Sequence, residues 1–189
     1  MCSRYYISPV IGEVLSALTH QPVAFQSRDV RPSDTAPILT ASDGKLGLSA
    51  LEWGFPASDK KRIINARAET AGEKKMFKRG LARHRVVIPA AGFYEWNALK
   101  EKHRFSRKDA PVIYLAGIAD RFQGRPCFVI LTTAANASVA PVHSRMPLVL
   151  EPEQLVPWIS NGGATDTLLK QTPAALYGQT DAHQLSMFD

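Results

Sequence analysis

The sequence of 189 residues contains only two cysteines, Cys2 and Cys127, which is too few for a disulfide framework. Neither cysteine lies in a CxxC pair, and no two histidines have metal-ligand spacing, so we expect a reduced protein without a metal or other cofactor. No apolar run is long enough to span a bilayer, and the start of the chain lacks the pattern of a secretory signal. These absences predict a cytoplasmic protein with no membrane role.

Internal repeats and low-complexity tracts are also missing. The hydrophobic share of 45% and aromatic share of 8% are ordinary for a globular protein. A chain of this length is expected to form one domain with a substantial core, since two full domains would be a tight fit. We expect this domain to be a monomer.

The hydrophobic pattern predicts short helices mixed with strands. Helices are expected over about residues 10 to 19, over Glu69 to Leu81 and after Pro152. Strand-like runs are Pro37 to Thr40, Leu46 to Phe55, Val86 to Ile88, Gly92 to Trp96, Val112 to Ile118 and Cys127 to Thr133. The charged segment 99–110 reads as an exposed hairpin. Without regular βαβ alternation, these elements indicate an α+β domain built on antiparallel sheet.

Positive charge is concentrated in one part of the chain. Residues 60 to 108 hold 15 Lys or Arg against 4 Asp or Glu, although the whole chain has a net charge of only +6. The basic groups are Lys60 to Arg62, Lys74 and Lys75, Lys78 and Arg79, and Arg83 to Arg85. Such a segment suits a face that contacts phosphates, and a solvated helix face explains it equally well.

Cys2 is the residue whose position suggests chemistry. Removal of Met1 would leave a free α-amine two carbons from a thiol, because aminopeptidases generally remove methionine before a small residue. An α-amine with a pKa near 8 is partly neutral at physiological pH, and neighbouring cations activate a thiol. Together these groups attack aldehydes: the amine forms an imine, and the thiolate closes a stable thiazolidine ring. The ordinary alternative is a small buried hydrophobe.

Five segments together carry a resemblance to a known family. They are Met1-Cys2-Ser3-Arg4-Tyr5, Trp53-Gly54-Phe55, Asn65-Ala66-Arg67-Ala68-Glu69-Thr70, Pro89-Ala90-Ala91-Gly92-Phe93-Tyr94-Glu95-Trp96 and His143-Ser144-Arg145-Met146-Pro147. In this order and spacing they resemble the SOS response-associated peptidase family, whose members shield abasic sites as thiazolidine crosslinks. The resemblance covers about residues 1 to 152. It implies a barrel-like, mostly antiparallel sheet flanked by short helices, with a positively charged groove for single-stranded DNA containing abasic sites.

The resemblance also implies roles for four residues. Cys2 would be the nucleophile, and Asn65 would hold the reacting terminus and the sugar oxygens. Glu95 would move protons, and His143 would assist opening of the deoxyribose ring, which must expose its aldehyde. Burial between two aromatic neighbours is expected to raise the pKa of Glu95. Taken singly, three of these residues have ordinary structural explanations. Asn65 would satisfy buried backbone groups, Glu95 would form an ion pair with Arg67, and His143 would be a core histidine.

Six residues are expected to contact DNA: Arg4, Trp53, Phe55, Arg67, Arg85 and Arg145. The arginines would meet phosphates, together with the run from Lys60 to Arg62. The rings of Trp53 and Phe55 would stack on bases beside the lesion. Trp96 is expected in the core.

Two other functions use the same features. One is a thiol-dependent peptidase, including self-processing, that uses Cys2, Asn65, Glu95 and His143. The other is a non-catalytic module that reads damaged DNA through its basic face and predicts reversible, salt-sensitive binding. The sequence also departs from the family pattern, since Ser3 replaces the usual glycine and the segment Arg28-Asp29-Val30-Arg31-Pro32 differs in chemistry.

The carboxyl-terminal end forms a separate unit in this interpretation. The domain is expected over residues 1 to 178, followed by a tail over 179 to 189. Within the tail, Gln184-Leu185-Ser186-Met187-Phe188 resembles the peptide by which bacterial proteins dock on the replication sliding clamp. Gln184, Leu185, Met187 and Phe188 would make the contacts, unless these apolar side chains simply pack against the domain.

Overall fold

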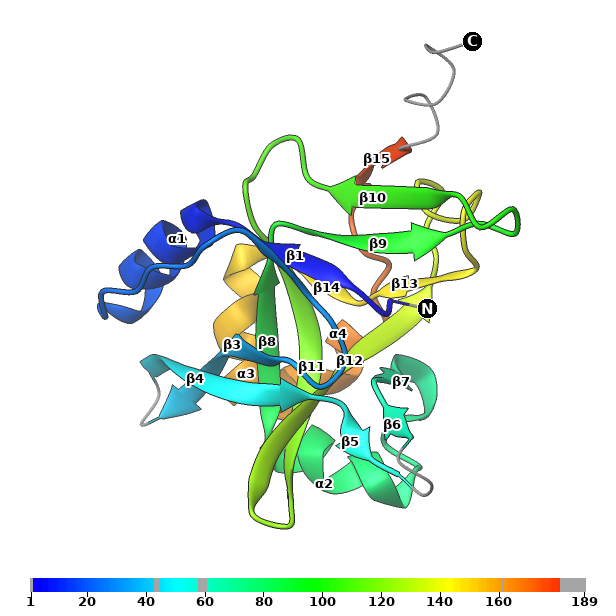
Figure 1. The fold of residues 1–189 in the computed structure, drawn as a ribbon. Helices are drawn as coiled ribbons and strands as arrows, with labels where there is room; N and C mark the ends of the chain where they lie inside the picture. The colour runs from blue at the N-terminus through cyan, green and yellow to red at the C-terminus, as the bar shows by residue number, and fades with distance from the viewer. Residues whose placement is uncertain (1, 43–44, 58–60, 161, 181–189) are drawn as a thin grey trace, which may run out of the picture.

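A closed barrel of five strands forms the centre of the protein (Figure 1). The computed structural model describes residues 2–42, 45–57, 61–160 and 162–180. The barrel strands are β3 (Thr35–Ser42), β4 (Lys45–Trp53), β8 (Arg85–Ala90), β11 (Ile113–Phe122) and β12 (Arg125–Ala134). Neighbours pair antiparallel, except that β4 pairs parallel with β12. That parallel pairing and the β11–β12 hairpin close the ring.

A second sheet continues from the barrel strand β8 through Ala91. It has the order β15-β10-β9-β1-β2, and its pairs are all antiparallel. The strands are β1 (Tyr5–Ile7), β2 (Arg28–Val30), β9 (Gly92–Trp96), β10 (Lys102–Ser106) and β15 (Tyr177–Thr180). Its inner face carries buried Phe93 and Phe105, whose rings stack at 5.3 Å between centroids.

Short strands place chain segments along the carboxyl half of β12. Strand β7 (Asn65–Arg67) pairs with it in parallel, and β13 (Arg145–Pro147) pairs antiparallel near its end. Three further short strands are β5 (Phe55–Pro56), β6 (Arg62–Ile63), which pairs with β5, and β14 (Val149–Leu150), which pairs with β11. Asn65 and Arg145 are thus fixed to the same barrel strand.

In the described ranges, four helices pack around the sheets. They are α1 (Pro9–Thr19), α2 (Lys75–Arg83), α3 (Leu155–Ser160) and α4 (Thr165–Lys170), with 3₁₀ turns η2 (Ala68–Thr70), η3 (Pro152–Gln154) and η4 (Gly162–Ala164). Helix α1 begins with a proline, whose fixed φ suits the first turn, and ends at His20, where φ is +55°. The helix expected over Glu69 to Leu81 is divided into η2 and α2.

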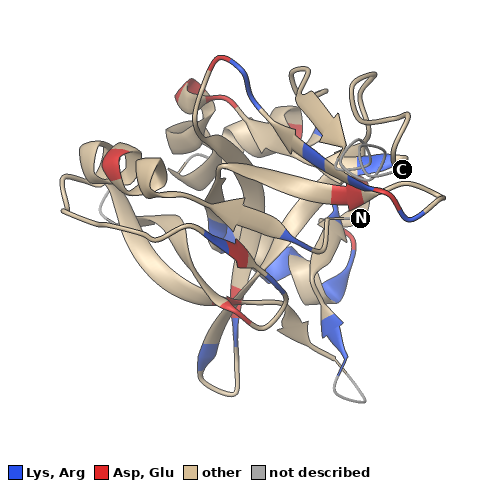
Figure 2. Cartoon of the chain, turned by 45° about the horizontal axis from the view of Figure 1, so that its top comes forward, with Lys and Arg blue, Asp and Glu red and all other residues tan. Residues whose placement is uncertain are grey.

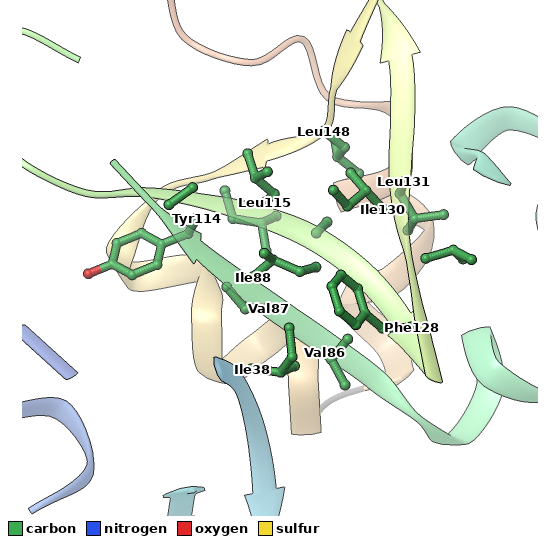
Figure 3. Packing of buried hydrophobic residues seen from close by; sticks show 14 of the residues in the cluster. Ile38, Val86, Val87, Ile88, Tyr114, Leu115, Phe128, Ile130, Leu131 and Leu148 are labelled. Atoms are coloured by element: carbon green, nitrogen blue, oxygen red, sulfur yellow. The ribbon is translucent and has the colours of Figure 1, made fainter. Parts of the chain in front are cut away.

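The core fills the barrel with aliphatic and aromatic side chains (Figure 3). Ile38, Ile88, Leu115 and Phe128 are fully buried there. Trp158 is also fully buried, and its Nε1 donates a hydrogen bond to the Val86 carbonyl at 3.0 Å. Such burial is the main favourable contribution to folding.

The expected single α+β domain with a barrel and short helices is confirmed. The segment expected as an exposed hairpin instead contains β10, which pairs with β9 on one side and β15 on the other. Strand β15 carries the paired structure past residue 178, to Thr180. In the ranges that the structure describes, none of the helices has the length and apolar character needed to cross a membrane.

Candidate active site

Cys2 lies just before β1 and is fully buried. Its backbone carbonyl accepts a hydrogen bond from Asn65 Nδ2 at 2.8 Å. Its Sγ lies 3.8 Å from the Arg4 carbonyl. Because Asn65 begins β7, which pairs with β12, this bond ties the start of the chain to the barrel. Both Cys2 and Cys127 are free thiols.

Glu95 lies on the inner face of β9 and is 2% exposed. Burial raises the pKa of this carboxyl, and nearby positive charges, including that of His143, act in the opposite direction. Burial also raises the pKa of the Cys2 thiol, and the negative charge of Glu95 raises it further. These mutual effects place Cys2, Glu95 and His143 in one neighbourhood, as expected from the sequence.

The high pKa of Cys2 corrects one expectation. The sequence suggested a thiol activated by neighbouring cations, whereas burial and a carboxylate neighbour favour the neutral thiol. A reaction at Cys2 therefore needs a group that accepts the thiol proton.

His143 is held by the backbone of the segment that leads into β13. Its Nδ1 accepts a hydrogen bond from the Arg145 backbone N–H at 2.9 Å. The same nitrogen lies 3.1 Å from the Arg145 carbonyl oxygen. The half-buried imidazole is therefore oriented by its own chain segment.

Other buried polar groups surround the site. The side-chain oxygens of Asn65 and Tyr5 are buried and have no hydrogen-bond partner among the residues that the structure describes. The pKa of Tyr5 is raised by burial and then by the charge of Cys2, which shows that its ring lies near the thiol. Buried oxygens of this kind ordinarily have partners, so they are available to a ligand. Tyr5 stands within the first motif, which was the available sequence signal, but it was not singled out.

His103 is a second group near Glu95 that the sequence did not reveal. It lies directly opposite Glu95 in the β9–β10 pair, and its Nε2 is buried with no hydrogen-bond partner in the described part of the chain. Side chains opposite each other in an antiparallel pair share one face of the sheet. Only the strand register identifies this neighbour, because the sequence predicts no more than an exposed hairpin for this charged segment.

The two aromatic residues expected to stack on DNA bases are inside the core instead. Trp53 and Phe55 are 0% exposed. The Trp53 ring stacks on Phe128 at 6.2 Å, and its Nε1 donates to the Ile64 carbonyl at 3.0 Å. The Phe55 ring contacts Phe122 at 4.7 Å. Base stacking on these two residues is therefore a wrong prediction.

Arg85 was expected to contact phosphate but is 7% exposed. It donates hydrogen bonds to the carbonyls of Leu81 at 2.7 Å, Ala82 at 3.1 Å and Trp158. Burial lowers the pKa of its guanidinium. Arg85 thus satisfies carbonyls at the end of α2 and in α3, which is a structural role.

Replacement of Arg85 by methionine is expected to destabilise the protein. The substitution keeps an extended side chain but leaves up to three carbonyls without donors, which costs about 3 kcal/mol. Chemical denaturation monitored by circular dichroism measures this change. The exposed Arg83→Met is the matched control, and equal unfolding midpoints for the two variants would contradict the structural role of Arg85.

The remaining arginines differ in their availability for DNA. Arg145 donates to both carboxylate oxygens of Glu69, at 2.6 and 2.8 Å, and to the Thr132 carbonyl. Arg67 is exposed on β7. Arg4 lies 3.7 Å from the Asp29 carboxylate, and Asp29 belongs to β2, the divergent segment of the sequence. Arg67 thus offers the more open cation, whereas Arg145 and Arg4 already have acidic neighbours.

The basic stretch of the sequence is divided between separate elements. Lys75, Lys78 and Arg79 lie on α2, whereas Lys102 and Arg104 lie on β10. Lys60 lies outside the described residues. Figure 2 shows Lys and Arg in several parts of the molecule. A single continuous DNA groove remains a prediction.

Comparison with known proteins shows the family to which the chain belongs. The family described as SOS response associated peptidase (SRAP) matches residues 1–187, and the chain belongs to this family. It is 32% identical over 186 residues to abasic site processing protein YoaM of Bacillus subtilis, covering 85% of this chain and 79% of that protein. It is 29% identical over 176 residues to abasic site processing protein YedK of Escherichia coli, covering 84% and 79%. A crystal structure of a protein from Bacteroides thetaiotaomicron has the same fold, with a TM-score of 0.80 at 24% identity, covering 95% of this chain and 91% of that one.

Proposed function

We propose that this protein forms a covalent thiazolidine crosslink between Cys2 and abasic sites in single-stranded DNA, once Met1 has been removed, and thereby shields these sites in the DNA damage response. The observation that carries the proposal is the meeting of Cys2, Asn65, Glu95 and His143, which come from four distant segments. The names of the relatives, abasic site processing proteins, support the choice of substrate.

The proposed reaction converts an aldehyde, an amine and a thiol into a ring and one water molecule. The Cys2 amine adds to the aldehyde carbon of the opened sugar and forms a carbinolamine. Glu95, whose raised pKa favours the protonated form, donates a proton to the departing hydroxyl. Water leaves, and an iminium ion remains beside the Glu95 carboxylate.

The same carboxylate then completes the ring. It accepts the proton of the Cys2 thiol, and the resulting thiolate adds to the iminium carbon. This step answers the need for a proton acceptor, because burial keeps the free thiol protonated. The hydrogen bond from Asn65 fixes the Cys2 backbone during both steps. The buried Oδ1 of Asn65 is available to a sugar hydroxyl. His143 assists opening of the sugar ring.

The decisive experiment mixes the protein with single-stranded DNA in which a uracil has been converted to an abasic site. Intact mass first establishes that Met1 has been removed. A slow band that survives heat and denaturing electrophoresis supports the crosslink. Reversible, salt-sensitive binding without such a band would support a non-catalytic reader instead, and cleavage of an added amino-terminal leader without an adduct would support a peptidase.

The carboxyl-terminal tail adds a second proposal about partners. Residues 181–189, which include Gln184, Leu185, Met187 and Phe188, lie outside the described residues, so the proposal rests on the sequence alone. We expect a peptide of residues 181–189 to bind a bacterial sliding clamp, with apolar side chains filling a pocket. Calorimetry measures the affinity, with Gln184→Ala and Phe188→Ala as controls. Undetectable binding at high micromolar concentration would refute it.

A further inference from the structure

The outer face of the second sheet, opposite the face that carries Glu95, presents a row of three aromatic rings. Tyr6 comes from β1, and Tyr94 and Trp96 come from β9. The centroids of Tyr6 and Tyr94 are 5.4 Å apart, and those of Tyr94 and Trp96 are 6.5 Å apart. All three side chains are half-buried, so they line a surface and do not fill a core.

Gly92 makes room for this row. A Cβ atom at Gly92 would lie 2.5 Å from the Tyr6 hydroxyl oxygen and 2.6 Å from its Cε1. Real Cβ atoms essentially never make nonbonded contacts this short. The Tyr6 ring therefore occupies the space that the Cβ atom of any other residue at position 92 would fill. The ring therefore lies across the sheet, close to its backbone.

A basic side chain stands beside each ring. The Arg104 guanidinium carbon lies 5.8 Å from the Tyr6 centroid, and Lys102 Nζ lies 4.8 Å from the Tyr94 centroid. The Arg4 guanidinium carbon lies 5.4 Å from the centroid of the Trp96 ring. The Asp29 carboxylate lies at the edge of the row, 3.2 Å from the Tyr94 hydroxyl. Three basic side chains and the Asp29 carboxylate thus border the row.

The row starts at the end of the sheet that holds the candidate active site. Tyr5 pairs with Phe93, and the Tyr94 backbone N–H donates to the Arg4 carbonyl at 3.0 Å. Cys2 and Glu95 therefore lie at the same end of the sheet as Arg4 and Trp96. A DNA strand held at Cys2 reaches the outer face by passing around this end.

We propose that the outer face binds the single-stranded DNA next to the reacting nucleotide, with bases on the rings of Tyr6, Tyr94 and Trp96 and phosphates at Lys102 and Arg104. This inference rests on the proposed function and extends it from one nucleotide to a strand path. Interleaved aromatic rings and cations are the usual surface for unpaired strands, because every base has a flat face to stack. Long basic side chains turn from a ring to a phosphate at little cost, and a guanidinium plane itself stacks on a base.

The first test removes the central ring. Tyr94→Leu is expected to weaken binding of an undamaged twelve-nucleotide single strand by about tenfold, whereas Tyr94→Phe, which keeps the ring, stays close to wild type. Fluorescence anisotropy measures the affinity, and circular dichroism confirms that both variants are folded. Equal affinities for the two variants would overturn the stacking role.

The second test reverses the charge of half-buried Lys102 and exposed Arg104. The double variant Lys102→Glu and Arg104→Glu is compared with Arg121→Glu and Arg125→Glu, which makes the same charge change on the β11–β12 hairpin. We expect the first pair to lose most of the affinity and to flatten the salt dependence, by roughly 0.7 in logarithmic slope for each phosphate that the protein no longer neutralises. Equal reductions in both pairs would show a general charge effect and overturn the proposal.

Undamaged DNA keeps this test separate from the proposed chemistry. A wild-type adduct with unaltered binding in the Lys102 and Arg104 variant would reject the strand path and leave the crosslink intact. The absence of an adduct in the wild type would reject the crosslink, whatever the binding data show.

Discussion

Replacing Cys2 by alanine is expected to abolish the heat-stable adduct with abasic DNA and to leave reversible binding of undamaged single strands largely intact. Alanine keeps the amine but lacks the sulfur that closes the ring, so any imine formed hydrolyses. Alanine also retains the Cys2 backbone carbonyl, which accepts the hydrogen bond from Asn65. Intact-mass spectrometry of the protein–DNA mixture, without reduction, measures the result.

Cys2→Ser is the matched control. Its amine still forms an imine, which borohydride traps, but serine is not expected to form a stable ring. We therefore expect an adduct only after reduction. An adduct from Cys2→Ala that survives without borohydride would show that another nucleophile reacts.

Glu95→Gln is expected to slow adduct formation by about 10² to 10⁴-fold, the usual contribution of a positioned acid or base. Glutamine has the same shape but neither donates the proton for loss of water nor accepts the thiol proton. Binding of undamaged DNA should change much less, because Glu95 is buried on the inner face of its sheet. Quenched time courses separate the rate from the affinity, and a loss of affinity as large as the loss of rate would contradict this role.

The raised pKa of Glu95 also gives the sign of two pH effects. The carboxyl is an effective proton donor below its folded pKa, so the Glu95-dependent part of the rate falls as pH rises through that value. The folded state holds this proton more tightly than the unfolded chain, so its contribution to stability also falls over the same pH range. Glu95→Gln should therefore gain thermal stability relative to wild type as pH rises. A constant difference across the range would contradict the assignment.

Local patterns in the sequence were enough for the main elements. The apolar spacing of residues 10 to 19 predicted α1, and the run from Gly92 to Trp96 matches β9 in full. The four residues of the candidate active site were identified through motif order, and the structure brings them together. These elements and residues can be predicted from the sequence because they depend on residue types that are close together in the chain or that occur at a fixed spacing.

Contacts between distant segments could not be predicted in this way. The residue types of Trp53 and Arg85 suit DNA and predict surface positions for both. In the structure Trp53 is buried against Phe128, and Arg85 is buried beside Trp158, two residues that are distant in the sequence. Trp96 was expected in the core, but alternation along β9 places it on the outer face, half-buried beside Arg4. Charge and aromaticity identify the residues that suit DNA, and only the register of the strands decides which of them face it.

The burial of both thiols has a practical consequence for handling the protein. Cys2 is 0% and Cys127 1% exposed, so a thiol reagent reaches either only when the surrounding structure opens. The labelling rate of Cys2 therefore reports how often the segment before β1 leaves Asn65, and that of Cys127 reports opening of the barrel at β12. In the chain that still carries Met1, this packing therefore also shields the Cys2 thiol from oxidants in the surrounding solution.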